Sequence, residues 1–251
     1  MTTAAAGTST PKPTRREERR RQTAQEIKDL AMAQVAADGP DAVSLSGIVR
    51  EMSMSPAAVY RYFANRDALL ADLVVDAYDA LADSLVALER GPGSAEEHLD
   101  VVLHATRTWA LEHPNAYRLV FQTSIGSGQE LALERTIPAA SRSMAVLVEA
   151  IGTVAAGRGA AAGPGDAAGP GDAAGLRASV AGWAERSGLA DVSVEVLTLA
   201  LLTWTRLHGI ISLEIGGHLG SMGIGADVLY ASEVAAIRAQ AGALPPVGSA
   251  G

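Results

Sequence analysis

Cysteine is absent from the 251 residues, so disulfide bonds and metal sites built from thiolates are excluded. Aromatic residues are scarce, with two Phe, five Tyr and three Trp. The hydrophobic residues, 48% of the chain, must therefore be mainly Leu, Val, Ile and Ala, with few β-branched runs, a composition that favours helices. Since no alternation typical of strands is found either, we expect an all-α fold.

Long apolar runs are lacking as well. No uninterrupted run approaches the ~18 residues of a membrane-spanning helix. The N-terminal stretch MTTAAAGTSTPKPTRREERRRQ has no apolar segment of the kind that a secretory signal carries. We therefore expect a cytoplasmic protein with no membrane partner.

Positive charge is in deficit over the chain, whose formal net charge is −8, but the deficit is uneven. Residues 1–70 hold ten Lys/Arg and eight Asp/Glu, whereas residues 71–251 hold ten Lys/Arg and twenty Asp/Glu. A weakly basic head on an acidic body indicates that the head meets an anionic partner. The same distribution is compatible with a solvated acidic surface, so charge alone does not decide.

The N-terminus begins with Ala, Thr, Pro and Gly, a composition typical of disorder. The basic stretch RREERRR follows at residues 15–21. It could be the solvated start of a helix or an arm beside DNA phosphates, and we favour the arm. We therefore expect residues 1–19 to form a disordered basic arm.

Signals for short helices are dense between residues 20 and 68. Apolar residues recur at helical spacing before Gly39 and Pro40, which end a first helix. Ser44 can cap a second helix, while Ser55 and Pro56 mark the start of a third. Two short helices with a brief break between them make a helix-turn-helix, so we assign residues 20–68 to a three-helix DNA-binding domain.

The stretch SPAAVYRYF at residues 55–63 holds three of the ten aromatic residues. On a helix, one face would carry Val59, Tyr62 and Phe63, which pack on the first two helices, and the other face would carry Ala57, Tyr60 and Arg61. An alanine methyl can touch a thymine methyl, an arginine can reach guanine or phosphate, and tyrosine hydroxyls can donate to phosphates. We therefore expect a recognition helix here, with the second helix offering Ser44 and Arg50 to the DNA backbone.

The sequence SLSGIVREMSMSPAAVYRYFANRDALL, from Ser44 to Leu70, resembles the DNA-binding domain of the TetR family of bacterial transcriptional regulators. The resemblance covers about residues 20–70. It implies DNA contacts by six residues of the third helix: Ser55, Pro56, Ala57, Tyr60, Arg61 and Tyr62. Arg66 stands where the family usually has lysine and keeps a phosphate-binding charge. Ser53 stands where glycine is usual, which raises the question of the turn's backbone angle.

The remainder of the chain, residues 69–243, is expected to be a helical effector-binding and dimerisation domain. The tandem repeat AAGPGDAAGPGDAAG at residues 161–175 has no core to bury, so we expect a flexible insertion at about 157–175 and a disordered tail at 244–251. The first helix of this domain runs from the cap Asn65 to about Arg90. Further helices are expected at 96–113, 115–124, 129–151 (with Pro138 kinking it), 176–186, 192–217 and 226–241.

A second resemblance, in the body, rests on the segments WALEHPNAYRLVF at residues 109–121 and WTRLHGIISLEI at 204–215. They are similar to a class of TetR C-terminal domains with a Trp…His-Gly signature. The resemblance implies a homodimer in which the last two helices pack in a four-helix interface.

Several body residues could line an effector cavity or belong to an ordinary core. The candidates are Trp109, Tyr117, Phe121, Met144, Trp204 and His208. Arg107, Arg118 and Arg206 could orient an acidic effector or pair with carboxylates.

No metal or cofactor is expected. His208, Glu214 and His218 invite a metal hypothesis, but His208 and Glu214 would lie nearly opposite each other on a helix, and the sequence has no H-E-x-x-H pattern. Nothing resembles a nucleophile elbow, a P-loop or a dinucleotide-binding loop, which argues against an enzyme.

We therefore expect a ligand-responsive transcriptional regulator. It would be a homodimeric repressor that a small-molecule effector releases from a double-stranded DNA operator. An effector-blind DNA-binding dimer remains an alternative, as does a helical enzyme.

Overall fold

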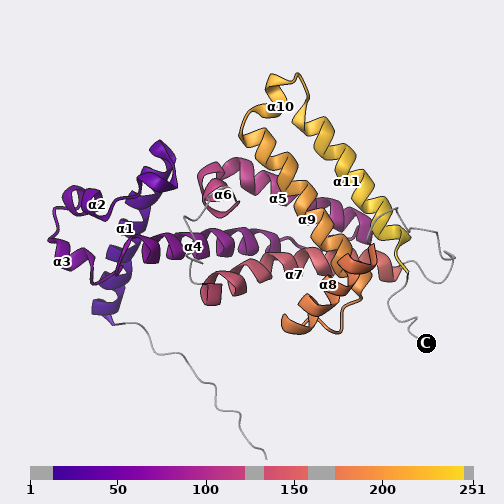
Figure 1. Ribbon diagram of the computed structural model, residues 1–251, viewed down its shortest axis with the longest axis horizontal. Helices are drawn as coiled ribbons and strands as arrows, with labels where there is room; N and C mark the ends of the chain where they lie inside the picture. The colour runs from indigo at the N-terminus through magenta and orange to yellow at the C-terminus, as the bar shows by residue number, and fades with distance from the viewer. Residues whose placement is uncertain (1–13, 122–132, 158–172, 246–251) are drawn as a thin grey trace, which may run out of the picture. The chain divides into compact units, whose positions relative to one another are not determined.

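The computed structural model describes residues 14–121, 133–157 and 173–245, and within these ranges every regular element is a helix (Figure 1). The all-α expectation is confirmed. The chain divides into two compact units, Met1–Leu70 and Ala71–Gly251. The expected disorder of residues 1–13 and 246–251, and most of the expected insertion, lie outside the described residues.

The first unit consists of α1 (Arg15–Asp38), a short 3-10 helix (Pro40–Ala42), α2 (Leu45–Glu51), α3 (Pro56–Val59) and the start of α4 (Arg66–Val86). Its core is formed by apolar residues spaced along these helices, which are at most 4% exposed: Ile27, Ala31, Val35, Ile48, Val59 and Phe63. This packing holds α2 against both α1 and α3.

The assignment of residues 15–19 to a disordered arm was wrong, because they form the first turns of α1. Thr14 and Glu17 make a capping box in which the Thr14 hydroxyl accepts from the Glu17 amide at 3.3 Å and the Thr14 amide donates to the Glu17 carboxylate at 2.7 Å. Such a box satisfies backbone groups that a helix start leaves free, so it fixes where the helix begins.

The second unit is a bundle built on the rest of α4. Its other helices are α5 (Ala95–Glu112), α6 (Pro114–Phe121), α7 (Leu133–Gly157), α8 (Ala173–Arg186), α9 (Val194–Ile215), α10 (His218–Ser221) and α11 (Ala226–Ala243). Helix α9 packs against α7, α8 and α11, while α5 packs against α7 (Figure 1). The centre of the unit therefore lies around α9, the most apolar segment of the sequence.

Three further helix boundaries among the described residues differ from expectation by three or more residues. Helix α8 begins at Ala173 and not at Leu176, so residues 173–175 belong to a helix and not to the expected insertion. Helix α4 ends at Val86 rather than near Arg90, and α7 continues through Pro138 to Gly157. Pro138 lies inside α7, where it has no amide to donate to the Glu134 carbonyl one turn earlier.

A hydrogen bond and an ion pair between helices stabilise the core of this unit. The fully buried Tyr230 of α11 donates its hydroxyl to the Leu103 carbonyl of α5 at 2.6 Å. The Arg107 guanidinium of α5 pairs with both carboxylate oxygens of Glu214 on α9, at 2.8 and 2.5 Å. These contacts join segments more than 100 residues apart in the sequence.

Two helices, α7 and α9, are long and apolar enough to cross a membrane by length and composition alone. Both pack within the bundle, and the core helices of soluble proteins pass the same test. Their apolar character is accounted for by the core that they share.

Candidate nucleic-acid interface and body cavity

The helix-turn-helix is delimited by two serine caps. The Ser44 hydroxyl accepts a hydrogen bond from the Gly47 amide at 3.2 Å, and the Ser55 hydroxyl accepts one from the Ala58 amide at 3.3 Å. Both caps agree with the sequence prediction. Each satisfies an amide that the start of a helix leaves without a partner, which fixes the two helix starts.

The recognition segment is less regular than expected. Only Pro56–Val59 is α-helix, and residues 60–62 form turns. Backbone hydrogen bonds between residues i and i+4, as in an α-helix, nevertheless continue through this segment. The Tyr60 amide donates to the Pro56 carbonyl at 3.0 Å, and the Phe63 amide donates to the Val59 carbonyl at 3.2 Å. The segment therefore keeps the two-faced arrangement that a helix would have.

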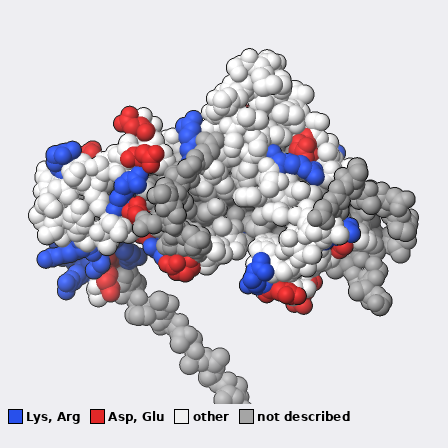
Figure 2. Space-filling view, viewed as in Figure 1, with Lys and Arg blue, Asp and Glu red and all other residues white. Residues whose placement is uncertain are grey.

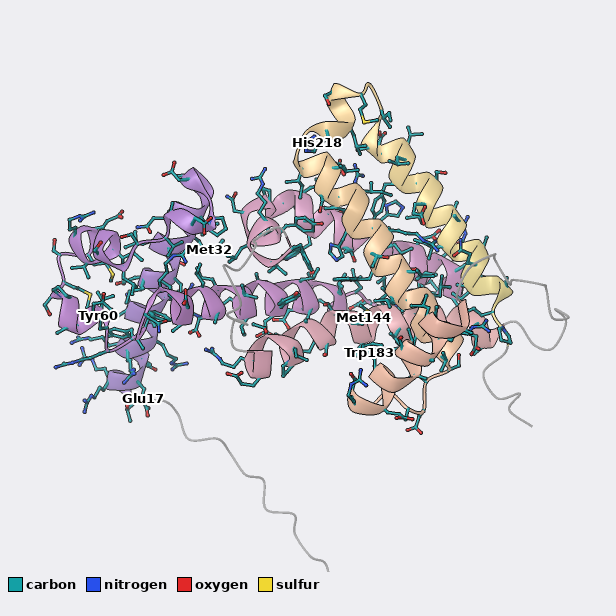
Figure 3. The ribbon with its side chains drawn as sticks, in the orientation of Figure 1. Glu17, Met32, Tyr60, Met144, Trp183 and His218 are labelled. Atoms are coloured by element: carbon teal, nitrogen blue, oxygen red, sulfur yellow. The ribbon has the colours of Figure 1, made fainter. Side chains whose placement is uncertain are left out.

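The two faces separate by burial as predicted. Val59 and Phe63 are 0% and 4% exposed, whereas Tyr60 is 52% exposed on the other face, together with Ala57 and Arg61 (Figure 3). The outward face thus presents a small residue, then an aromatic ring and a cation. This is the chemistry that reads base edges and phosphates.

The turn between α2 and α3 holds its backbone in the left-handed region at Ser53, whose φ is 52°. Within the described residues, Ser53 is the one residue other than glycine with a positive φ. Glycine tolerates this region, whereas other residues meet a steric penalty there. The serine at this position therefore carries local strain.

The two further arginines expected near phosphates differ in their surroundings. Arg50 is exposed and makes no ion pair with the described residues. Arg66 donates to the Pro40 carbonyl at 2.7 Å and to the Val43 carbonyl at 3.1 Å, and it lies 3.4 Å from the Asp41 carboxylate. Arg66 therefore fastens the start of α4 to the 3-10 helix, a structural role that the sequence did not reveal.

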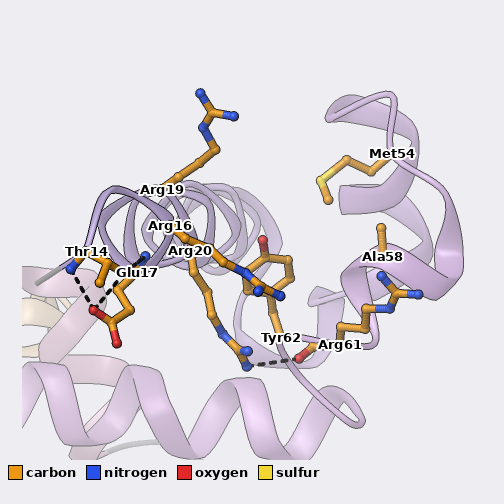
Figure 4. Close-up of a pocket in the computed structure, with 9 residues that line it drawn as sticks. All are labelled: Thr14, Arg16, Glu17, Arg19, Arg20, Met54, Ala58, Arg61 and Tyr62. Carbon is orange, nitrogen blue, oxygen red and sulfur yellow. Dashed lines mark hydrogen bonds between the residues drawn. The ribbon is translucent and has the colours of Figure 1, made fainter.

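The arginines of residues 15–21, which we expected on a disordered arm beside DNA phosphates, lie on α1. Arg16, Arg19 and Arg20 follow helical spacing and line an open cleft of about 640 Å³ together with Arg61 and Tyr62 (Figure 4). Figure 2 shows Lys and Arg side chains gathered on one side of this unit. In the stretch RREERRR, the helical spacing of Arg16, Arg19 and Arg20 is the sequence signal for this surface.

Arg20 links this group to the recognition segment. Its guanidinium lies over the Tyr62 ring, 5.7 Å from the centroid, and 3.5 Å from the Arg61 carbonyl oxygen (Figure 4). Tyr62 is accordingly only partly exposed. The first turns of α1 and the end of the recognition segment thus form one basic surface.

In the second unit, four of the six effector candidates line one small cavity of about 30 Å³ between α4, α5, α6, α7 and α9. They are Phe121, Met144, Trp204 and His208. Tyr117 touches this group through ring contacts with Phe121 and His208 at 5.0 and 5.6 Å between centroids. Trp109 does not line the cavity; its ring stacks on His113 at 5.4 Å.

His208 is the polar centre of this cluster. The Tyr117 hydroxyl lies 3.1 Å from His208 Nδ1, 3.1 Å from the His208 carbonyl oxygen and 3.0 Å from Ser212 Oγ. Burial lowers the pKa of His208 to about 4, because the charged imidazolium would lose its hydration. Burial also raises the pKa of Tyr117. Both groups are therefore neutral at physiological pH.

Two of the arginines considered for an acidic effector are paired with carboxylates. Arg107 pairs with Glu214, and Arg206 lies 3.1 Å from Glu233. Arg118 donates to the Ile215 carbonyl at 3.3 Å. Arg107 and Arg206 therefore pair with carboxylates of the protein and are not free to orient an acidic effector.

The metal hypothesis around His208, Glu214 and His218 finds no geometric support. Nowhere in the described ranges do three side chains of His, Asp or Glu converge as metal ligands would. Glu214 is instead held by Arg107.

Family models match both units. The family described as "Bacterial regulatory proteins, tetR family" matches residues 27–73, and the one described as "Tetracyclin repressor-like, C-terminal domain" matches residues 99–237. The HTH-type transcriptional regulator Mb1846 of Mycobacterium bovis is 31% identical over 219 residues, which cover 82% of this chain and 86% of that protein.

Solved structures agree with this match. The regulatory protein SCO4313 has a TM-score of 0.70 and 34% identity, covering 89% of this chain and 98% of that one. The regulator FadR of Bacillus subtilis, solved with stearoyl-CoA, has a TM-score of 0.56 at 12% identity, covering 86% and 98%, and thus shares the fold alone. With both of its units matched and relatives above 30% identity along most of its length, the chain belongs to the TetR family of bacterial transcriptional regulators.

Proposed function

We propose that this regulator is a homodimeric repressor that acts in the cytoplasm and leaves its DNA operator when a small molecule binds the second unit. The observation that carries the DNA-binding part is the outward face of the recognition segment. Exposed Tyr60 and Arg61 stand over the buried Val59 and Phe63, beside the arginines of α1. A cation and a hydroxyl presented side by side on an exposed face can make both base and phosphate contacts.

The recognition segments of a dimer would enter successive major grooves of a near-palindromic site. Two-fold symmetry then requires half-site centres about 34–36 Å apart, or a multiple of this distance. Selection of bound sequences from a random DNA pool tests this directly. We expect an enriched inverted repeat, while a pool that stays random after selection would contradict specific DNA reading.

The dimer is proposed to form through α9 and α11. Helix α9 exposes Leu213 at 43%, and α11 exposes Val228 at 70%. Gly209 lies one turn before Leu213 on the same face of α9, and a Cβ added there would meet nothing within 4 Å. Exposed apolar side chains beside a small residue are typical of a surface that packs against another helix.

Introducing a negative charge on this exposed face tests the interface without disturbing the core. Val228→Glu and Gly209→Glu should shift the sedimentation coefficient from dimer to monomer and leave the helical circular dichroism unchanged. Val86→Glu is the matched control, because Val86 is a similarly exposed valine at 62% at the end of α4. A dimer that persists in both α9 and α11 variants would refute this interface.

The ligand-responsive part is supported by the cluster of aromatic and polar side chains around the small cavity, and by the stearoyl-CoA found in FadR, a protein of the same fold. A ligand would favour one of two dimer states and so change the population that binds DNA.

An effector-blind dimer is the second candidate, and one observation favours it. The cavity of about 30 Å³ is far smaller than the roughly 300–1,000 Å³ typical of ligand sites. A thermal-shift screen against metabolites separates the two, because an effector raises the melting temperature and the same compound must also lower operator affinity.

A further inference from the structure

The cavity in the second unit has no charged side chain in its lining. Its walls are mostly Leu, with Phe121, Met144 and Trp204, and its polar groups are Thr106, Ser143 and His208. The two hydroxyls already donate within their own helices, Thr106 to the Val102 carbonyl at 3.0 Å and Ser143 to the Ala140 carbonyl at 2.9 Å. His208 is neutral because burial lowers its pKa to about 4. A charged ligand would therefore meet no counter-charge on this lining.

The cations on the surrounding helices are engaged elsewhere. Arg107 is held by Glu214, and Arg142 of α7 lies 2.5 Å from both Asp79 and Asp83 of α4. Freeing Arg107 to meet an anion would leave the Glu214 carboxylate, only 17% exposed, without its partner. Burying an ion without a partner is strongly unfavourable, so this site disfavours carboxylates, phosphates and ammonium groups.

The walls favour a flat ring. The ring of Phe121 lies 4.0 Å from that of His208 and 6.5 Å from that of Trp204, and the Trp204 and His208 rings are 5.1 Å apart at 67°. Aromatic rings in such edge and tilted arrangements attract a further ring by dispersion and by their quadrupoles. A planar aromatic ligand therefore gains more binding free energy in this cavity than a flexible aliphatic ligand of the same size.

One hydrogen-bonding position remains open on this wall. His208 Nδ1 faces the Tyr117 hydroxyl, whereas Nε2 of the same ring makes no hydrogen bond with the described residues. The proton of the neutral ring sits on one nitrogen or the other, so Nε2 serves as donor or acceptor according to the tautomer. A hydroxyl group on the guest matches either form.

Two side chains can enlarge the cavity. Met144 lies on α7 in the bundle and has an adaptable, unbranched side chain (Figure 3). Trp204, at 38% exposed, can turn further outward because its ring is not fully buried. The closed form, with room for about one water, is then in equilibrium with an open form that a guest selects.

We propose that this cavity takes a neutral aromatic molecule carrying one hydroxyl group, and that it rejects acids, phosphate esters and amines of the same shape. The proposal rests on the ligand-responsive function above and names the chemical class of the effector.

Three probes with the same ring system and different charge test it on the full-length dimer. These are 1-naphthol, 1-naphthoic acid and 1-naphthylmethylamine, used at pH 7.5 and compared by isothermal titration calorimetry and thermal shift. We expect 1-naphthol to bind at least tenfold more tightly than either charged probe. An equal or higher affinity for the acid or the amine would overturn the proposal.

Two variants locate the binding. Met144→Ala should tighten 1-naphthol binding several-fold because it removes side-chain volume from the cavity, while Met222→Ala, at a methionine 68% exposed after α10, should change nothing. His208→Phe should weaken 1-naphthol relative to naphthalene. Absence of binding by both the wild type and Met144→Ala would also overturn the proposal, as would equal effects of the two methionine variants.

Operator affinity is measured on the same samples, so the two proposals fail separately. If 1-naphthol binds as expected but operator affinity is unchanged, the cavity assignment stands and the ligand response is refuted. If an operator complex is released by a charged compound alone, the response stands and the neutral class is refuted.

Discussion

The Arg107 guanidinium of α5 donates two hydrogen bonds to the Glu214 carboxylate of α9, and the two side chains are only 20% and 17% exposed. The Glu214 partner, which acts mainly through the hydrogen bond, raises the pKa of Arg107. The Tyr230 ring packs on the same guanidinium, 5.3 Å from the ring centroid. This pair is therefore a largely buried joint between two core helices.

Removing one member of this joint should cost more than removing both. Arg107→Met or Glu214→Leu alone leaves a largely buried charge without its partner, and we expect about 3 kcal/mol of destabilisation from each. The double variant should lie within about 1 kcal/mol of the wild type, since apolar side chains of similar size can replace such a pair. Urea unfolding of the four proteins checks this, and additive losses in the double variant would refute the account.

The outward face of the recognition segment is expected to supply operator affinity. Arg61→Ala should weaken operator binding by roughly 1–3 kcal/mol if the guanidinium reads a guanine. Tyr60→Phe keeps the ring and removes the hydroxyl, so it isolates the phosphate hydrogen bond. Fluorescence anisotropy with a selected operator measures both. Arg186→Ala, at an exposed arginine that ends α8, is the control, and unchanged affinity in both Tyr60 and Arg61 variants would refute the assignment.

The arginines on α1 should contribute to DNA affinity by contacting phosphates, and they should not distinguish one base sequence from another. Arg16→Ala with Arg19→Ala should lower the steepness of log affinity against log salt by about 0.9 for each phosphate that is no longer neutralised. The decrease in affinity should be equal for operator and unrelated DNA. Arg177→Ala with Arg186→Ala removes two exposed arginines from α8 as a matched control. A salt slope identical to the wild type would show that α1 does not touch DNA.

The strained turn predicts a substitution that stabilises. Ser53→Gly should raise the stability of the first unit by about 0.5–1 kcal/mol, because relief of the left-handed backbone exceeds the added freedom of the unfolded chain. Ser46→Gly, inside α2, should instead destabilise by about 0.5–1 kcal/mol. Thermal unfolding followed by circular dichroism distinguishes the opposite signs, and destabilisation by both would contradict the strain at Ser53.

The buried His208 predicts a pH dependence of stability. Its folded pKa of about 4 lies below the unfolded value of 6.5, so the unfolded state binds the proton first as the pH falls. The stability that depends on a neutral His208 is fully present above pH ~6.5. As the pH falls toward ~4, the free energy of unfolding decreases by up to about 3 kcal/mol. His208→Gln should flatten this part of the profile of unfolding free energy against pH. A wild-type slope no steeper than that of the variant would contradict the burial of a neutral imidazole.

The local signals of the sequence were reliable wherever a short stretch decides its own structure. The caps Ser44, Ser55 and Asn65 all accept the expected hydrogen bonds, since a capping side chain reaches only two or three residues along the chain. The two faces of the recognition segment were predictable for the same reason, because Val59 and Phe63 are one turn apart and apolar. The start of α1 was missed even though its capping box is local, since the composition of the preceding residues outweighed it.

Tertiary structure alone decided which distant groups meet. The sequence by itself determined an all-helical chain with a DNA-reading helix-turn-helix, because helical periodicity, caps and side-chain chemistry are all short-range properties. It did not reveal that Arg66 would bond the Pro40 and Val43 carbonyls, or that Arg107 would find Glu214 across 107 positions. Trp109 and His208 looked equivalent as effector contacts, and packing separated them. Such pairings follow from how helices dock, a long-range outcome of the whole core that no single stretch of residues encodes.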